Sequence, residues 1–224
     1  KELLESNIVK LDKNNKIRDF FYNRLMFPIT NEYGKIVGFG GRVLDNSNPK
    51  YINSPESDFF KKRNILYNLF NAKQIIRSKK NMLICEGYMD VISLYDKNIK
   101  TAVAPLGTSL TENHLQLSWK YVNKPTLMFD GDQSGLKASF KSAIMSLPYL
   151  TPSKLLQFVI LPNEYDPDTY INEYSLNKFA SYLKNPLSIV DFIFQESSKL
   201  IDLQKPDNKV IYDNYIDELI GSIN

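Results

Sequence analysis

Two short apolar runs, each closed by acidic residues and glycine, constrain this chain more than any other feature. The first is Met82–Asp90, MLICEGYMD, and the second is Leu127–Asp132, LMFDGD. An apolar run of about four residues that ends at Gly is typical of a buried strand. Ligands of open α/β sheets bind just outside the carboxyl ends of the strands. We therefore expect Glu86 and Asp130 at a binding edge of a sheet.

A third acidic pair repeats the pattern. Asp166 and Asp168 follow the apolar run Leu155–Ile160, with the same i, i+2 spacing as Asp130 and Asp132. Alternate residues of an extended segment point the same way, so each pair can flank one cation. A single Asp-x-Asp is more often a solvated turn, but three acidic clusters at three strand ends favour a Mg²⁺ site.

Strand and helix patterns alternate around these clusters. From residue 81 to residue 170, apolar runs alternate with helical patterns, which predicts a parallel sheet covered by helices on both faces. Tyr88–Asp96 has helical spacing, and Ser109-x-x-Glu112 is a capping box that predicts a helix to about Val122. Only helical patterns follow Asp168.

The first 80 residues have a different pattern. Asn23–Ile29 and Ile36–Leu44 are predicted to pair as a hairpin. Residues 48–55 are predicted to be extended or looped between two prolines. Phe60–Ser78 is predicted to be helical toward its end, where apolar residues recur on one face.

Charge is distributed unevenly along the chain. Residues 1–80 carry 16 Lys and Arg against 8 Asp and Glu, whereas residues 81–224 carry 12 against 17. A basic part beside an acidic part suits a polyanion on one side and metal ions on the other, although lysine-rich stretches are more often solvated surface. No apolar run approaches the ~18 residues that a membrane span needs.

One cysteine and one histidine exclude two kinds of site. Cys85 has no partner for an internal disulfide, which suits a reducing compartment, and Cys85 with His114 cannot form a zinc site alone. We expect Cys85 to be a buried apolar residue and His114 to be structural. The polar start is no secretory signal, and because it lacks an initiator Met we expect a fragment of a longer protein.

The sequence DGDQSG allows two other interpretations. A calcium-binding EF-hand loop needs Glu at its twelfth position, which is Lys141 here, and a helix rather than a strand before it. That interpretation is rejected. An aspartyl-phosphate phosphohydrolase would use Asp130 as nucleophile. It gives no role to Glu86, and it remains the alternative.

Combined, the motifs resemble a known family. Glu86-Gly87-Tyr88-Met89-Asp90 with Asp130-Gly131-Asp132 is similar to the Toprim signature of primases, topoisomerases and some nucleases. Further segments resemble bacterial DNA primase of the DnaG type: Arg24–Ile29, Gly38–Leu44, Pro49–Glu56, Leu106–Thr108, His114–Leu117 and Phe129–Gly135. This resemblance covers nearly the whole chain except its last few dozen residues.

The resemblance implies an α/β fold in three parts. It places a small mixed and basic N-terminal subdomain at residues 1–80 and a Toprim metal-binding domain with a parallel sheet and flanking helices at residues 81–170. A C-terminal helical subdomain follows at residues 171–224.

The resemblance also implies roles for individual residues. The implied catalytic residues are Glu86, Asp130 and Asp132. The implied metal ligands are Glu86, Asp90, Asp130, Asp132, Asp166 and Asp168. The implied nucleotide- or template-binding residues are Arg24, Arg42, Lys50, Tyr51, Asn53 and Lys62. Lys61 is an open alternative to Lys62, and Tyr22 stands where the family often has a second arginine.

The implied activity is DNA-templated synthesis of short RNA primers from ribonucleoside triphosphates during DNA replication. It is a Mg²⁺-dependent nucleotidyl transfer in which Mn²⁺ can substitute. The implied partners are a single-stranded DNA template, the RNA primer and, through a C-terminal domain outside this sequence, the replicative helicase. Zinc would belong to another module outside it.

We expect a cytoplasmic, monomeric fragment with no membrane partner, acting at the bacterial replication fork. A Toprim topoisomerase, a Toprim nuclease and a DNA-binding module without catalysis remain alternatives.

Overall fold

The computed structural model describes residues 2–107, 109–199 and 206–221. At its centre lies a five-stranded sheet in the order β10-β9-β8-β6-β7. Its strands are β6 (Leu83–Ile84), β7 (Ala102–Val103), β8 (Thr126–Leu127), β9 (Gln157–Phe158) and β10 (Leu187–Ser188). Strands β6 to β9 pair in parallel, which confirms the predicted sheet, and β10 adds an unexpected antiparallel edge.

Successive residues of these strands enter opposite cores. Leu83 and Met128 pack on one face, whereas Ile84 and Leu127 pack on the other, as the period of two in a strand requires. The first face is covered by α3 (Tyr88–Asp96), α6 (Pro167–Glu173) and α7 (Leu176–Lys184). The second is covered by α2 (Leu69–Lys79), α4 (Glu112–Trp119), α5 (Gln133–Ser146) and α8 (Ile189–Ser197). The predicted α/β fold class is therefore confirmed.

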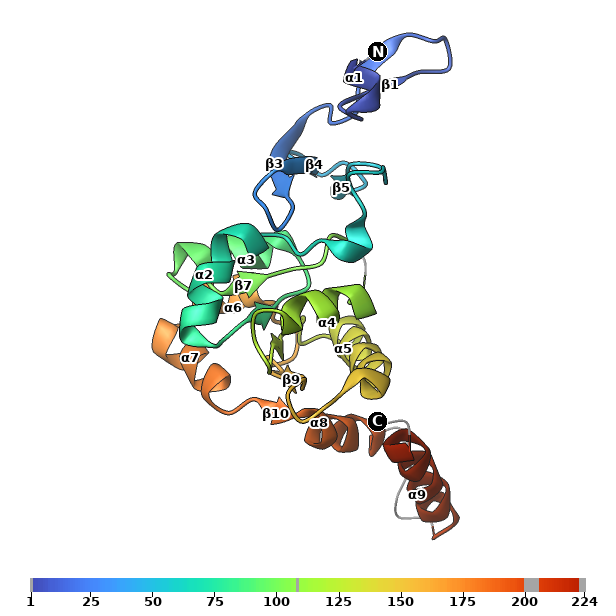
Figure 1. Cartoon of the computed structure of the whole chain (residues 1–224), viewed down its shortest axis with the longest axis vertical. Coiled ribbons are helices and arrows are strands. Elements are labelled where there is room, and N and C mark those ends of the chain that lie inside the picture. Colours follow the sequence, from blue (N-terminus) through green and yellow to red (C-terminus); the bar gives the residue numbers. More distant parts are fainter. Residues whose placement is uncertain (1, 108, 200–205, 222–224) are drawn as a thin grey trace.

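A smaller antiparallel sheet precedes the central one. It has the order β3-β4-β5, with β3 (Arg24–Thr30), β4 (Ile36–Val43) and β5 (Tyr51–Asn53). The predicted hairpin is confirmed as β3 and β4, and β5 forms within the segment expected to be extended or looped. Before it come α1 (Glu2–Glu5) and a hairpin of β1 (Val9–Leu11) and β2 (Ile17–Asp19), which was not expected. Figure 1 shows this hairpin at one end of an elongated molecule and α9 (Pro206–Gly221) at the other.

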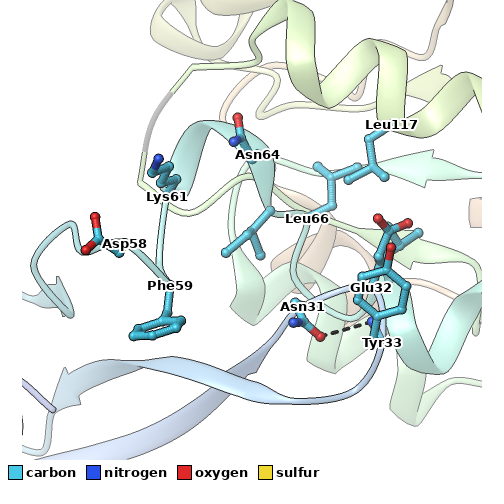
Figure 2. A pocket seen from close by; sticks show the side chains of 11 residues that line it. Asn31, Glu32, Tyr33, Asp58, Phe59, Lys61, Asn64, Leu66 and Leu117 are labelled. Atoms are coloured by element: carbon cyan, nitrogen blue, oxygen red, sulfur yellow. Dashed lines mark hydrogen bonds between the residues drawn. The ribbon is translucent and has the colours of Figure 1, made fainter.

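The β3–β4 turn is held against the helices of the central sheet. Tyr121 donates a 3.0 Å hydrogen bond to the carboxylate of Glu32, and Lys73 Nζ donates to its backbone carbonyl at 2.7 Å. Figure 2 shows Glu32 and Tyr33 beside Leu66 and Leu117 around a pocket of about 200 Å³. These contacts join the β3–β4 turn to the helices that cover the central sheet.

A second joint is apolar. Ile29 of β3, Phe60, Ile65, Tyr88 of α3 and Leu106 form one buried cluster. Phe60 and Ile65 flank a short 3₁₀ turn, Lys62–Asn64. The small sheet is therefore packed on the central one through side chains from both parts.

The start of α4 differs from the sequence prediction. Its capping residue is Thr111, whose side-chain oxygen accepts from the amide of His114, so the box predicted at Ser109 is wrong. Thr111 Oγ1 also donates to the carbonyl of Arg63 at 2.8 Å. This contact between segments distant in sequence selects the cap.

The two lone residues are buried, as expected. His114 Nε2 donates to the carbonyl of Lys62 at 2.9 Å, and Nδ1 accepts from the amide of Thr111 at 3.2 Å. Both ring nitrogens are thus used structurally. Cys85 is a free, fully buried thiol.

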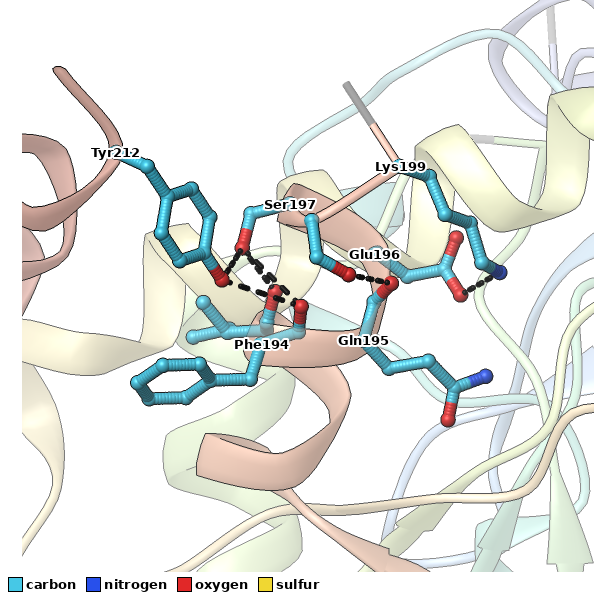
Figure 3. A network of polar contacts seen from close by, with 8 residues as sticks. Phe194, Gln195, Glu196, Ser197, Lys199 and Tyr212 are labelled. Carbon is cyan, nitrogen blue, oxygen red and sulfur yellow. Dashed lines mark hydrogen bonds and ion pairs between the residues drawn. The ribbon is translucent and has the colours of Figure 1, made fainter. Parts of the chain in front are cut away.

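Helix α9 is linked to α8 by a small polar network. The hydroxyl of Tyr212 lies 3.0 Å from Ser197 Oγ and donates to the carbonyl of Phe194 at 3.3 Å (Figure 3). Across residues 2–107, 109–199 and 206–221, none of the helices has the length and apolar character that a bilayer crossing needs.

Candidate metal and nucleotide cleft

The acidic residues lie where parallel strands end and helices begin. Glu86 follows β6, with Gly87 capping α3. Asp130 follows β8, and Asp132 caps α5. Asp166 follows β9 and caps α6. Three helix N-termini, each carrying partial positive charge, therefore begin at the edge where the carboxylates gather.

Glycine brings two of these loops into contact. The amide of Gly131 donates to the carbonyl of Tyr165 at 2.8 Å, and a Cβ at Gly131 would overlap the carbonyl oxygen of Pro162. A Cβ at Gly135 would overlap the carbonyl of Asp130. The absence of a side chain at Gly131 therefore lets the acidic loop after β8 lie against the loop before α6, and its absence at Gly135 lets the start of α5 lie against Asp130.

A cleft of about 490 Å³ opens between the acidic edge and the small sheet. Nine of the residues predicted from the sequence line it: Arg42, Lys50, Tyr51, Asn53, Glu86, Asp90, Asp130, Asp166 and Asp168. Acidic groups come from the central sheet and basic groups from β4 and the loop before β5. The structure thus gathers both charge signs around one cavity.

Four of the carboxylates already accept hydrogen bonds from their own surroundings. Asp90 accepts from the amide of Gly87 at 2.9 Å, Asp132 from the amide of Gly135 at 2.7 Å, and Asp166 from the amide of Thr169 at 2.6 Å. Asp168 accepts from Ser93 Oγ at 2.6 Å and from Asn172 Nδ2 at 2.8 Å. These bonds fix the orientation of each carboxylate and use part of its accepting capacity.

Asp130 is different, because its Oδ1 is buried and has no hydrogen-bond partner. A buried carboxylate oxygen without a donor is costly unless a cation or a proton satisfies it. Oxygen donors are the ligands that hard divalent cations prefer. The donor chemistry of these residues therefore fits a divalent metal ion, which Asp130 would bind.

Burial and mutual repulsion shift the titration of this cluster. Burial raises the pKa of Asp130 to about 7, with further upward shifts from Glu86, Asp166 and Asp132. Burial likewise raises the pKa of Asp90 to about 7, against the lowering effect of the Gly87 amide. The pKa of Glu86 is raised overall. Burial raises it most, a backbone hydrogen bond from Asp130 offsets part of the rise, and the charge of Asp132 adds to it. Such shifts are typical of carboxylates that lack a compensating cation.

Among the residues that the structure describes, no lysine or arginine forms an ion pair with the cluster. Among the same residues, no group of three or more His, Cys, Asp or Glu side chains is positioned to hold a metal ion. The cluster is thus an open acidic edge rather than a complete protein cage, the arrangement that suits Mg²⁺ with water and phosphate ligands.

The basic side of the cleft is built around Tyr51. Arg42 Cζ lies 5.8 Å and Lys50 Nζ 5.6 Å from the centre of its ring. Burial raises the pKa of the Tyr51 hydroxyl, while Arg42 lowers it and Asp90 raises it. The Tyr51 side chain is therefore close to the cations Arg42 and Lys50 and also feels the charge of the carboxylate of Asp90.

Three residues predicted for the site do not line the cleft. Arg24 donates instead to backbone carbonyls, at 2.8 Å to Pro49 and 3.3 Å to Gly41. Lys62 lies in the 3₁₀ turn, and Asp132 is the exposed N-cap of α5, whose charge raises the pKa of Glu86. Arg24 holds the loop that carries Lys50, whereas a ligand role for Lys62 and Lys61 stays a prediction.

Several lining residues were not predicted: Gly87, Tyr88, Met89, Pro105, Gly107 and Thr169. Tyr88 is the middle residue of the Glu86–Asp90 motif, so its place within that motif was an available signal. Thr169 could have been found as the partner of a capping Asp166 in the sequence D-x-x-T. Pro105 and Gly107 reach the cleft through a loop whose path the sequence does not reveal.

Two family descriptions match this arrangement. Residues 1–73 match the family described as DNA primase catalytic core, N-terminal domain, and residues 83–171 match the family described as Toprim-like. Fold and cleft therefore define a Toprim-like protein joined to an N-terminal domain of the primase type.

Solved structures and curated relatives agree with this class. The chain is 36% identical to a structure described as the DnaG primase catalytic domain bound to ssDNA, with a TM-score of 0.90 over 99% of this chain and 71% of that one. A DNA primase domain from Pseudomonas aeruginosa is 34% identical, with a TM-score of 0.91 over 99% and 70%. The DNA primase of Escherichia coli strain K12 is 37% identical over 92% of this chain.

The chain belongs to the DnaG primase family. It spans 36% of the length of the Escherichia coli DNA primase and 36% of that of Buchnera aphidicola, to which it is 42% identical over 93% of this chain. The resemblance stated from the motifs is confirmed, and the Toprim family implies use of a divalent metal.

Proposed function

We propose that this chain is the catalytic part of a DNA primase, which copies a single-stranded DNA template into short RNA primers from ribonucleoside triphosphates. One observation carries the proposal: an open edge of carboxylates faces Arg42 and Lys50 across a single cleft of about 490 Å³. Phosphoryl transfer needs this combination, because the protein mainly positions the reactants and neutralises charge.

On the acidic side, Glu86 and Asp130 would be the principal ligands of Mg²⁺, for which Mn²⁺ would substitute. Asp132 would join them, and Asp90, Asp166 and Asp168 would complete the acidic surface. A divalent cation bound there supplies positive charge at the reacting phosphate and favours ionisation of the attacking hydroxyl. The buried, unpartnered Oδ1 of Asp130 supports this assignment.

On the basic side, Arg42 and Lys50 would bind the triphosphate, and Tyr51 and Asn53 would contact the nucleotide between them. The 3′-hydroxyl of the primer then attacks the α-phosphorus. A new oxygen–phosphorus bond forms as the hydroxyl loses its proton to water, the bond from the α-phosphorus to the bridging oxygen of the β-phosphate breaks, and pyrophosphate leaves. The protein contributes by holding the two reactants in line and by matching their charge.

Three functional regions follow from this assignment. Residues 1–80 would bind nucleotide and template, residues 81–170 would hold the metal, and residues 171–224 would form a helical support. A structurally similar protein is described as bound to ssDNA, which supports a single-stranded template here. In the whole protein, a zinc module and a helicase-binding domain would complete a cytoplasmic replication enzyme.

A primer-synthesis assay tests the proposal. The chain is incubated with single-stranded DNA, labelled ribonucleoside triphosphates and Mg²⁺, and the products are resolved by length. We expect short RNA that requires template, all needed nucleotides and the metal. Loss of synthesis in Asp130→Asn and normal synthesis in Asp96→Asn, a carboxylate at the far end of α3, are the expected controls.

Other outcomes point to other enzymes. Degradation of the DNA with Mg²⁺ alone indicates a nuclease, and relaxation of supercoiled DNA without nucleotides indicates a topoisomerase. Release of phosphate from a phosphomonoester indicates the phosphohydrolase alternative. Any of these without RNA synthesis contradicts the proposal.

A further inference from the structure

Two buried polar atoms beside the cleft lack hydrogen-bond partners although their chemistry is complementary. They are the hydroxyl of Tyr88, in a side chain that is only 6% exposed, and Oδ1 of Asn53. The hydroxyl can donate, and Oδ1 can only accept. The side-chain amide of Asn53 is held in one orientation, because its Nδ2 donates to the carbonyl of Leu106 at 3.2 Å. A donor and an acceptor are thus left unpaired in the same region.

Both groups meet at Gly40 in the middle of β4. A Cβ built on Gly40 would lie 3.2 Å from Asn53 Oδ1 and 3.3 Å from Cε1 and Cζ of Tyr88. The absent side chain of Gly40 therefore lets Asn53 Oδ1 and the edge of the Tyr88 ring that carries the hydroxyl lie against the same backbone position.

The two residues belong to opposite sides of the cleft. Tyr88 is the first residue of α3, two positions after Glu86, and Asn53 ends β5, two positions after Tyr51. The Tyr88 ring packs on Phe27 of β3, with 5.0 Å between ring centres, and on Tyr51, with 5.5 Å. A hydrogen bond between Tyr88 and Asn53 would tie the acidic strand edge directly to the strand that carries Tyr51.

We propose that Tyr88 is a positioning residue, whose hydroxyl donates to Asn53 Oδ1 when a nucleoside triphosphate occupies the cleft. The bond fixes β5 opposite Glu86 and Asp130, so Asn53 and the neighbouring cations are held at the right distance from the metal. This inference rests on the proposed function, because it requires the cleft to bind a nucleotide.

Tyr88→Phe removes the hydroxyl and leaves the packed ring. In the free protein the variant is expected to be as stable as the wild type or more stable, because a buried donor without a partner is removed. Affinity for ATP in the presence of Mg²⁺, measured by calorimetry on the whole 224-residue chain, is expected to fall about fivefold, the effect of one net hydrogen bond. In primer synthesis the KM for nucleotide rises, and kcat changes little.

A double-mutant cycle identifies the partner. If Tyr88 acts through Asn53, Tyr88→Phe has no further effect on ATP affinity once Asn53→Ala is present. Tyr67→Phe is the matched control, since its ring lies 5.6 Å from that of Tyr88 in the same aromatic cluster but does not line the cleft. That control is expected to bind ATP as the wild type does.

Any of the following results overturns the inference. Unchanged ATP affinity in Tyr88→Phe removes the positioning role, and an equal loss in the Asn53→Ala background removes Asn53 as partner. A fall in melting temperature with unchanged affinity shows that the hydroxyl serves the fold alone. If the wild type binds no ATP, the proposed function fails together with this inference. If the wild type binds ATP and Tyr88→Phe binds it equally well, the inference fails but the proposed function stands.

Discussion

The backbone amide of Gly131 donates a 2.8 Å hydrogen bond to the backbone carbonyl of Tyr165. This bond joins the loop after β8 to the loop before α6, so two acidic pairs that are far apart in sequence share one edge. Asp166 comes close enough to Asp130 to raise its pKa. The electrostatics of the candidate site thus depend on a contact between two backbones.

Gly131→Ala tests that contact. The added methyl group would overlap the Pro162 carbonyl, so we expect a loss of at least about 2 kcal/mol of unfolding free energy and loss of metal binding. Urea unfolding measures the first effect. Gly221→Ala, at a position with nothing within 4 Å of the new atom, is the matched control and is expected to be neutral. A fully stable, metal-binding Gly131→Ala would contradict the account of this loop.

Asp130→Asn tests the repulsion within the acidic edge. Without added metal, the variant is expected to be more stable than the wild type by up to about 1 kcal/mol, because a charge facing Glu86 and Asp166 is removed and solvent screens much of the repulsion. The comparison is made by thermal and urea unfolding in EDTA. A clear loss of stability would mean that the carboxylate mainly serves the fold.

His114 gives the chain a defined pH dependence. Its pKa is lowered by burial, and Nδ1 must stay unprotonated to accept from Thr111. Because the pKa is lower in the folded state than in the unfolded state, stability is present above the unfolded pKa and is lost as pH falls through the range between the two. His114→Gln is expected to be less stable by about 1–3 kcal/mol at pH 8.

The difference between His114→Gln and the wild type should shrink as pH falls from 8 to 5. Urea unfolding of both proteins across this range measures it, and subtraction removes the contribution of every other titrating group. A difference that stays constant with pH would show that the imidazole does not hold the neutral form described here.

Arg42 and Arg24 both lie in the three-stranded sheet, but substitution of the first is expected to affect binding and substitution of the second stability. Arg42 faces the cleft, so Arg42→Ala should weaken nucleotide or template binding and reduce the slope of log affinity against log salt by about 1. Arg24 donates to the carbonyls of Pro49 and Gly41, so Arg24→Ala should lower stability by about 1.5–3 kcal/mol. Salt titration of binding and urea unfolding separate the two effects. An unchanged salt slope in Arg42→Ala contradicts its assignment.

Much of the fold could be predicted because local signals and tertiary structure agree. The apolar runs before Glu86 and Asp130 contain the strands β6 and β8, and both acidic residues follow the ends of those strands. The alternation of strand and helix patterns predicts the parallel pairing of the sheet. The strands are shorter than the apolar runs, because residues such as Met82 and Phe129 continue into the core beyond the paired positions.

What could not be predicted depends on contacts between distant segments. Strand β10 has two residues, too few for a periodic signal, and forms only because β9 offers an edge. The cap at Thr111 is selected by the carbonyl of Arg63. Arg24 was expected in the site because of its charge and motif, yet neighbouring carbonyls occupy its guanidinium. Sequence indicates which residues carry charge, and the fold decides what each charge faces.

The central claim is that the acidic edge binds a divalent cation through Asp130. Calorimetric titration of Mg²⁺ or Mn²⁺ into the wild type, Asp130→Asn and the control Asp96→Asn tests it without any need for catalysis. We expect saturable binding to the wild type and to Asp96→Asn, and at least about tenfold weaker binding to Asp130→Asn. Equal metal affinity in the wild type and Asp130→Asn would contradict the claim.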